Sequence, residues 1–164
     1  CQQQVLDLQP DGQQTADELF ARSDGAVAAV NGAYEQLALL SSSEFSMMQR
    51  VEEKSDNAFH ARAETAWKTY LETPSTPGIS ETWGAFFAAI QRANTVLNRV
   101  GQTAFTQAEQ TANLKGFLEG QAYFLRALSY FYLVQLYGDV PLYLDEIKDP
   151  STAQQPRAPA AEVY

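Results

Sequence analysis

The chain has 164 residues, and its 45% apolar content is enough to form the core of one domain. A net charge of −9 and a sequence pI near 4.5 repel phosphate backbones, which excludes nucleic acid as an expected partner. The apolar run from Ala127 to Leu136 is interrupted by Ser129 and Gln135. It also falls short of the about 20 residues that span a bilayer, so the sequence predicts no transmembrane helix.

The only cysteine is Cys1, and the chain holds one histidine. A single cysteine excludes internal disulfides, and with one histidine it excludes a Cys/His zinc site, so we expect no metal and no cofactor. Cys1 has three interpretations: the acylated first residue of a lipoprotein whose leader has been removed, an artificial chain boundary, or a free thiol at a frayed end. The polar segment behind it is typical of a tether, which we assign to residues 1–14.

The first helix is predicted to begin at Thr15, because Thr15 and Glu18 have the spacing of a capping box. Gly25 and Gly32 lie inside this helix and permit close approach of a neighbouring helix. Three serines at residues 41–43 end it. Its apolar face consists of Phe20, Val27, Val30, Tyr34 and Leu37.

The next region, residues 44–71, has a less regular pattern. A short helix is expected around Met47 and Val51, a break at residues 54–57, and renewed helix over residues 58–71. The loop over residues 72–78 contains two prolines and a glycine. A helix capped by Ser80 follows, and Gly101 closes it. One stripe of this helix is expected in the core, with an asparagine bonded between helices: Trp83, Phe87, Ile90, Asn94 and Leu97.

A second capping box, Thr106 with Glu109, predicts the longest helix, which runs from there to Tyr137. This helix is apolar over most of its circumference, so we expect it to be buried between neighbours. Gly138 and Pro141 stop it. Strand signals are nearly absent, and the predicted fold is all-α.

Ala127 and Phe131 have the spacing of the second helix of a tetratricopeptide unit, and Trp83 with Phe87 would then lie in its antiparallel partner. The sequence therefore predicts tetratricopeptide-like helical pairs.

Two charged residues, Glu119 and Arg126, lie seven positions apart on one face of the longest helix. One interpretation is a structural network, largely buried, in which Arg126 bonds Glu119, a backbone carbonyl or a tyrosine hydroxyl. The other is a ligand-binding arginine in a cleft. An unpaired buried charge would cost several kcal/mol, so we expect the network.

Evidence for catalysis is weak. Glu52, Glu53, Asp56 and Glu64 form a loose carboxylate group, and glycosidases use such pairs. With 20 acidic residues in the chain, neighbouring carboxylates arise by chance. His60 stands without a nucleophile elbow or a phosphate-binding glycine loop, so we expect no enzyme.

The segment EGQAYFLRALSYFYLVQLYGDVPL, residues 119–142, closely resembles a signature of the SusD/RagB family of outer-membrane lipoproteins. Further segments follow the family order: Cys1 with residues 7–10, residues 32–34, the break at residues 54–56, and the helix from Trp83 to Leu97. Gly120 is a small departure, since the family usually has Ala there.

The resemblance implies a fold of tetratricopeptide-like pairs in proteins much longer than 164 residues. Residues 15–164 would be the N-terminal helical domain, truncated before the C-terminal part of the family fold. The resemblance also implies a lipid anchor on Cys1 and a location on the surface of the Gram-negative outer membrane. There the protein would capture an oligosaccharide or another nutrient and deliver it to a SusC-like TonB-dependent transporter, without covalent chemistry.

In glycan-binding relatives, the segment after the break supplies rings that stack on sugars and an asparagine. Here that position holds Asn57, Phe59, His60, Arg62 and Trp67. The tryptophans expected near His60 and Arg62 are missing, so Phe59 and Trp67 are the candidate stacking rings. A second interpretation of Trp67 is that it packs against a neighbouring helix.

Two alternative functions remain at this stage. A peptide-binding adaptor of tetratricopeptide type would show two or more regular repeats, and this sequence shows at most one. A surface glycosidase would bring two carboxylates together across a cleft.

Overall fold

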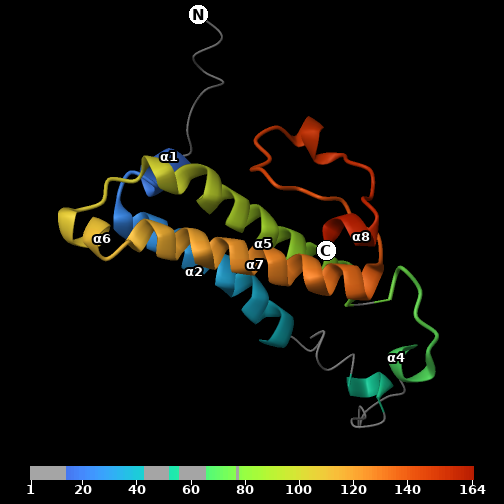
Figure 1. The fold of residues 1–164 in the computed structure, drawn as a ribbon. Coiled ribbons are helices and arrows are strands. Elements are labelled where there is room, and N and C mark those ends of the chain that lie inside the picture. The colour runs from blue at the N-terminus through green and yellow to red at the C-terminus, as the bar shows by residue number, and fades with distance from the viewer. Residues whose placement is uncertain (1–13, 43–51, 56–65, 77) are drawn as a thin grey trace, which may run out of the picture.

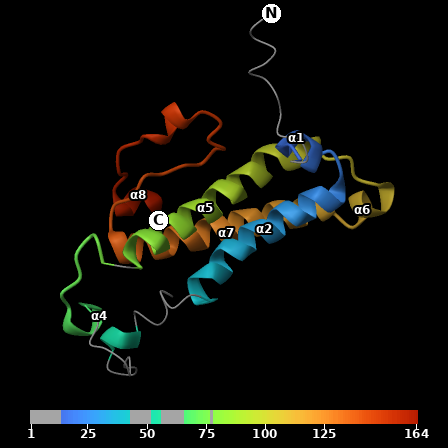
Figure 2. The same ribbon diagram turned by 180° about the vertical axis from the view of Figure 1, so that it is seen from behind.

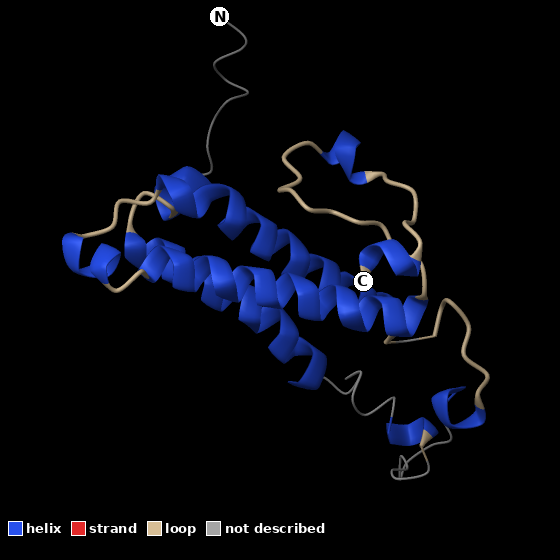
Figure 3. Ribbon diagram, in the orientation of Figure 1, coloured by secondary structure: helices blue, strands red, loops and turns tan. Residues whose placement is uncertain are grey.

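The computed structural model describes residues 14–42, 52–55, 66–76 and 78–164. Three long helices pack side by side (Figures 1 and 2): α2 (Ser23–Ser42), α5 (Ile79–Arg99) and α7 (Leu114–Tyr137). The shorter helices are α1 (Ala16–Leu19), α4 (Ala66–Thr69), α6 (Gln107–Thr111) and α8 (Ala160–Val163), with 3-10 turns η2 (Val100–Gln102) and η3 (Pro150–Ala153). Within the described residues Figure 3 shows helices and loops without a strand, which confirms the all-α prediction.

The first capping box is present, but the helix it opens is short. Thr15 Oγ1 accepts a hydrogen bond from the Glu18 amide at 3.2 Å, and Glu18 accepts one from the Thr15 amide at 2.8 Å. The chain then leaves the helix after Leu19 and starts α2 at Ser23. The single helix predicted from Thr15 is therefore wrong. The turn inserts Phe20 into the core, and burying this ring stabilises the break by about 2 kcal/mol.

Gly25 allows that turn to form. A Cβ atom at this position would lie 1.8 Å from the Leu19 carbonyl oxygen, so α1 packs directly on the backbone of α2. The close approach predicted at Gly25 exists, but between the end of α1 and the start of α2. At Gly32, an added Cβ atom would meet no backbone atom of another segment. The Arg92 side chain donates a hydrogen bond to the Gly32 carbonyl.

The helix predicted from Thr106 to Tyr137 is also two helices. Thr106 and Glu109 do form a capping box, but α6 ends at Thr111 and Asn113 adopts a left-handed conformation with φ 53° before α7 begins. Asparagine tolerates this conformation better than most residues. At the other end, α7 stops at Tyr137 as predicted, and Gly138 has φ 69°.

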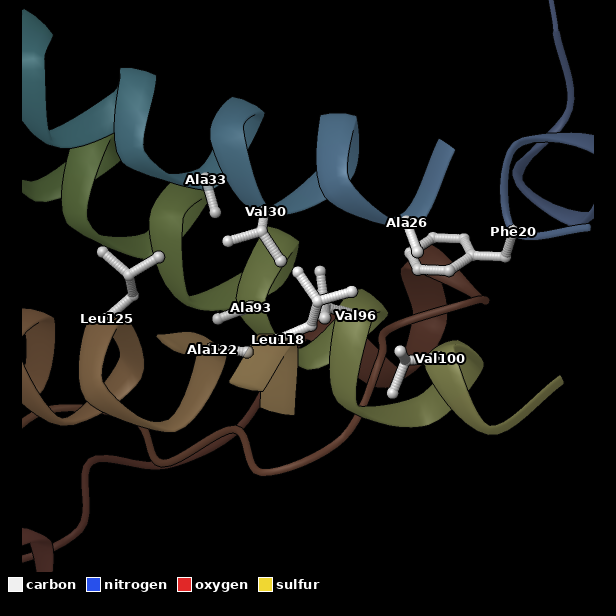
Figure 4. Packing of buried hydrophobic residues seen from close by; sticks show 10 residues of the cluster. All are labelled: Phe20, Ala26, Val30, Ala33, Ala93, Val96, Val100, Leu118, Ala122 and Leu125. Atoms are coloured by element: carbon white, nitrogen blue, oxygen red, sulfur yellow. The ribbon is translucent and has the colours of Figure 1, made fainter. Parts of the chain in front are cut away.

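The core has two parts. The first fills the space between α2, α5 and α7, where Figure 4 shows side chains from all three helices directed towards one another. Its buried members are Phe20, Ala26, Val30, Ala33, Ala93, Val96, Val100, Leu118, Ala122 and Leu125. The second lies between α5, α7 and the C-terminal segment, and consists of Phe86, Ile90, Tyr130, Leu133, Val134 and Val140.

Helices α5 and α7 are antiparallel, and the Trp83 ring near the start of α5 lies 5.0 Å from the Tyr137 ring at the end of α7. This is the pair that the tetratricopeptide-like spacing predicted. Phe86 is fully buried, whereas Trp83 and Phe87 are half-buried, so the core face is rotated relative to the predicted stripe.

Helix α7 is buried on one side only. Leu118, Leu125 and Leu133 are in the core, while Phe117, Phe124 and Phe131 are 63%, 57% and 45% exposed. The prediction that neighbours surround this helix is therefore wrong for the described chain. None of the described helices is both long and apolar enough to cross a membrane.

After Gly138 the chain returns along α5 and α7 and ends at α8. Val140 and Ala158 exchange two backbone hydrogen bonds of 3.3 and 2.9 Å, which close this return into a loop. Arg99 of α5 donates from Nε to both carboxylate oxygens of Glu146 at 2.9 Å. This ion pair raises the pKa of Arg99 and holds the loop on the helical layer.

Candidate ligand-binding surface

Of the predicted ligand-binding segment, residues 57–67, the structure describes only the C-terminal end, which includes Trp67. Trp67 lies on α4 and is half-buried. In Figure 1, α4 lies at the lower right, beyond the three-helix layer. The predicted residues Asn57, Phe59, His60 and Arg62 fall outside the described residues, as does Cys1.

Trp67 belongs to a group of four side chains that we call the Trp67 cluster: Lys54, Trp67, Tyr70 and Glu72. The Lys54 ammonium lies 5.3 Å from the centroid of the Trp67 ring and 5.5 Å from that of Tyr70. Lys54 also forms an ion pair with Glu72. The Tyr70 hydroxyl donates a hydrogen bond of 2.6 Å to the Lys54 carbonyl oxygen. One lysine therefore connects two aromatic rings and a carboxylate.

The electrostatics of this cluster follow from the ion pair. The hydrogen bond from Lys54 holds the pKa of Glu72 below its usual value. Cation–π attraction of about 0.5–1 kcal/mol per exposed contact orders Lys54 between the rings.

The Trp67 cluster offers the side-chain types that carbohydrate recognition uses. Tyr70 is 63% exposed and has φ 57°, so its ring projects from the turn after α4. Flat rings stack on the apolar face of a sugar, while ammonium and carboxylate groups bond its hydroxyls. The arrangement can bind a sugar without changing it chemically.

Sequence reasoning identified Trp67 but missed Lys54, Tyr70 and Glu72 as its neighbours. Tyr70 follows Trp67 by three positions, but α4 ends at Thr69 and Tyr70 lies in the turn after it, so helical spacing alone does not predict this grouping. Lys54 was interpreted only as part of a helix break. Its contact with a tryptophan 13 residues later depends on tertiary structure.

Glu119 and Arg126 are both half-buried, and they interact with different residues. Glu119 pairs with Lys115 at 3.5 Å, one turn earlier on α7. Arg126 Nη1 donates hydrogen bonds of 2.8 Å to Asn94 Oδ1 and to the Leu144 carbonyl. The expected link between the two fails because seven helical residues span about 10 Å, and each has a nearer partner.

Asn94 is the centre of the network that Arg126 joins. It is fully buried, and its Nδ2 donates to the carbonyls of Tyr143 at 2.9 Å and Asp145 at 3.1 Å. The Tyr130 hydroxyl accepts a 2.6 Å hydrogen bond from the Tyr143 amide. These bonds attach the C-terminal loop to α5 and α7. The role predicted for Asn94 is thus extended, because it bonds a loop as well as a neighbouring helix.

An aromatic hollow of about 360 Å³ lies between α5 and the C-terminal loop, and Trp83, Phe87 and Tyr143 contribute to its walls. These rings already have partners. The Arg157 guanidinium lies 5.4 Å from the Trp83 ring centroid, and the Tyr143 hydroxyl donates to the Ala153 carbonyl. These contacts hold the loop against α5. In the described ranges, no three His, Cys, Asp or Glu side chains are arranged to hold a metal ion.

A SusD-like family model, described as starch-binding associating with outer membrane, matches residues 4–164. The chain belongs to this SusD-like family. Among curated relatives, a SusD-like protein of Bacteroides ovatus is 25% identical over 148 residues, which is 90% of this chain and 27% of the relative. The SusD-like protein P2 of Formosa agariphila is 34% identical over 88 residues, 52% of this chain and 16% of the relative.

Two solved SusD-like structures from Bacteroides fragilis share the fold. One, described as a SusD-like carbohydrate binding protein, has a TM-score of 0.72 and 21% identity, covering 88% of this chain and 29% of the other. The second has a TM-score of 0.63 and 19% identity, covering 90% and 28%. This SusD-like chain therefore spans about a quarter of the length of the first of these curated relatives and of both structures. The family's description associates it with the outer membrane.

Proposed function

We propose that this SusD-like protein binds an oligosaccharide at the surface of a Gram-negative bacterium and delivers it to a SusC-like TonB-dependent transporter. The observation that carries this proposal is the family match over residues 4–164. The similar structure from Bacteroides fragilis is described as a carbohydrate binding protein, which agrees with a sugar as the ligand. No covalent step is proposed.

Within the described chain, the Trp67 cluster is the part that suits this function. It presents two rings, an ammonium and a carboxylate within one short region. Asn57, Phe59, His60 and Arg62 lie between Lys54 and Trp67 in the sequence, and we propose that they extend the same surface. Sugar stacking on one ring contributes about 1 kcal/mol, comparable to other aromatic contacts.

The binding test uses the full-length protein and calorimetric titration with oligosaccharides selected on a glycan array. A Phe59→Ala, Trp67→Ala double variant should weaken binding about tenfold or more, which corresponds to roughly 1.4 kcal/mol. A Trp67→Phe variant keeps a ring and serves as the matched control, with a smaller loss expected. Each variant's melting temperature is measured alongside.

A lowered melting temperature with unchanged affinity per folded molecule would remove Trp67 from the site and leave it as a packing residue. Absence of binding to any oligosaccharide by the folded wild-type protein would contradict the proposed function itself.

The proposed anchor is a lipid on Cys1, supported by the position of this cysteine ahead of a polar segment. Metabolic labelling with a fatty-acid analogue should tag the full-length protein, and a Cys1→Ser variant should lose the tag. Persistence of the label in that variant would place the acyl group elsewhere.

A further inference from the structure

The return loop after α7 begins with a short segment that lies on α5 and α7, and we call this segment the strap: residues 141–147. In Figure 1 it belongs to the loop that leaves the end of α7 and returns to α8. The strap is neither helix nor strand, and its own backbone groups make no hydrogen bond to other backbone groups of the described chain. Its conformation therefore depends on the side chains that it contacts.

Two amide side chains of α5 donate to carbonyl oxygens of the strap. Gln91 Nε2 donates to the Ile147 carbonyl at 3.3 Å. Asn94 Nδ2 donates to the Tyr143 carbonyl at 2.9 Å and to the Asp145 carbonyl at 3.1 Å. These bonds are made to the main chain, so α5 binds the strap through groups that every residue has.

Helix α7 bonds the strap from the other side of the groove. Arg126 Nη1 donates to the Leu144 carbonyl at 2.8 Å. The Tyr130 hydroxyl accepts a hydrogen bond of 2.6 Å from the Tyr143 amide. Side chains of both helices thus bond successive backbone groups of one short, irregular segment.

The side chain of Asn94 is preorganised to bind carbonyl groups. It is fully buried, and its Oδ1 accepts a hydrogen bond of 2.8 Å from Arg126. This bond fixes the orientation of the amide, so that Nδ2 is the group directed at the strap. A buried donor without an acceptor costs about 1–3 kcal/mol, so an empty groove is unfavourable and a backbone carbonyl is the group that fits it.

Alternate parts of the strap lie inward and outward. Leu142 packs against the second core, and the Tyr143 ring lies 5.8 Å from the Phe87 ring. Leu144 and Asp145 are exposed. Main-chain hydrogen bonds combined with pockets for some of the side chains are the way in which proteins recognise bound peptides.

The strap is attached to the helices without being part of either core. Neither core counts a strap residue among its buried members. The hollow of about 360 Å³ lies between the strap and α5, and a second hollow of about 260 Å³ is lined by the strap and by Thr152 and Gln155. The strap can therefore leave the groove while the helices stay packed.

We propose that the groove between α5 and α7 is a binding site for an irregular or extended peptide, and that the strap occupies it as an internal ligand. While the strap is bound, no other peptide enters, which separates this chain from a peptide-binding adaptor with an open groove. The proposal does not depend on the oligosaccharide, because the Trp67 cluster takes no part in it.

The first test measures whether the emptied groove binds a peptide in trans. The probe is a fluorescent synthetic peptide with the sequence of residues 140–148, and the protein is the full-length chain. In the wild type, the strap competes at the high effective concentration of a linked ligand, so we expect no binding of micromolar peptide. A loosened-strap variant carries Tyr143→Gly, Glu146→Gly and Ile147→Gly, which remove the contacts with Phe87 and Arg99 and leave the helices unchanged. This variant should bind the peptide at least tenfold more tightly than the wild type.

An isosteric pair of substitutions shows whether the peptide uses the groove. Asn94→Asp replaces the donating amide with a carboxylate oxygen that repels carbonyl groups, and it still accepts from Arg126. Asn98→Asp is the matched control, because it makes the same change at an exposed position of α5. In the loosened-strap background, Asn94→Asp should weaken peptide binding at least tenfold, and Asn98→Asp should leave it unchanged.

Limited proteolysis provides a measurement that needs no loosened strap. In the otherwise wild-type protein, Asn94→Asp should accelerate chymotrypsin cleavage after Tyr143 or Leu144 at least tenfold relative to Asn98→Asp. Cleavage within α7 should stay slow in both variants, because release of the strap is a local opening.

Three results would overturn the proposal. A folded loosened-strap variant that binds the peptide no better than the wild type would show that the groove is not a peptide site. Peptide binding that is insensitive to Asn94→Asp would place the peptide elsewhere. Equal cleavage of the strap in the Asn94→Asp and Asn98→Asp proteins would show that Asn94 does not hold the strap in the groove.

Discussion

At the scale of single residues, Arg126 shows how a charge that suggests a binding site serves the fold instead. Its guanidinium bonds Asn94 and the Leu144 carbonyl and lies 5.3 Å from the Tyr123 ring centroid. Asn94 in turn bonds two carbonyls of the C-terminal loop. Arg126 therefore stabilises the attachment of the loop to the helices.

Substituting Arg126 should reduce stability in a way that depends on the replacement. Arg126→Met and Arg126→Ala both remove the donor to Asn94 and Leu144, which costs about 1–3 kcal/mol because partly buried acceptors lose a charged partner. Methionine refills the volume and alanine does not, so Arg126→Ala should cost more. Urea unfolding measures both.

Arg22→Ala is the control, because the Arg22 side chain is 80% exposed and its loss should change the free energy of unfolding by less than about 0.5 kcal/mol. Equal stabilities of Arg126→Met and Arg22→Ala would exclude the structural role of Arg126.

At the scale of elements, the two helix breaks account for much of the difference between prediction and structure. The capping boxes at Thr15 and Thr106 were recognised and exist, but each begins a helix of only four or five residues. The prediction that each of these helices continues into the next one was wrong, because helical periodicity persists across a break when the following helix faces the same core. Asn113 was a local signal for the second break. The first depends on the burial of Phe20, which only the packed structure reveals.

Gly25 should be the most sensitive position in the first break. A Gly25→Ala substitution places a Cβ atom against the Leu19 carbonyl, which the geometry leaves at 1.8 Å, so α1 must move. We expect a loss of about 1–3 kcal/mol, as for other overpacked sites. The opposite sign is expected for Gly84→Ala, which lies on an open helix face and gains helix propensity of up to about 1 kcal/mol. Thermal unfolding of the two variants tests this, and a stabilising Gly25→Ala would contradict the packing of α1 on α2.

At the scale of the whole molecule, the sequence predicted the all-α fold, the antiparallel pair and the end of the longest helix. Those features follow from local signals and from periodicity. The Trp67 cluster was predicted only in part, because Lys54, Tyr70 and Glu72 meet Trp67 through a turn whose conformation is set by more than spacing. The exposed side of α7 was predicted wrongly for a different reason. A helix that is apolar over most of its circumference predicts neighbouring helices on every side, but the described chain packs against only one side of α7.

Tyr130 in the second core and Tyr137, which is half-buried against it, predict how the stability of the whole molecule depends on pH. Burial raises the pKa of Tyr130 and Tyr137 to about 12. Below the usual pKa of 10 both states are protonated. Between pH 10 and pH 12 the unfolded chain loses protons that the folded chain keeps, so the folded state loses stability as pH rises through this window.

Urea unfolding at about pH 9 and about pH 11 measures this loss. A Tyr130→Phe, Tyr137→Phe double variant should start less stable, since it lacks hydrogen bonds to Tyr143 and Ile79, but should show a smaller decline over the same interval. An identical decline in the double variant would assign the alkaline sensitivity to other groups.

The most direct test of the proposed function is a crystal structure of the full-length protein with an oligosaccharide that it binds in solution. We predict a sugar ring stacked on Trp67 or Tyr70, with Lys54 or Glu72 within hydrogen-bond distance of its hydroxyls. A bound oligosaccharide that contacts neither ring nor any of residues 57–62 would contradict the assignment of the site to this part of the chain.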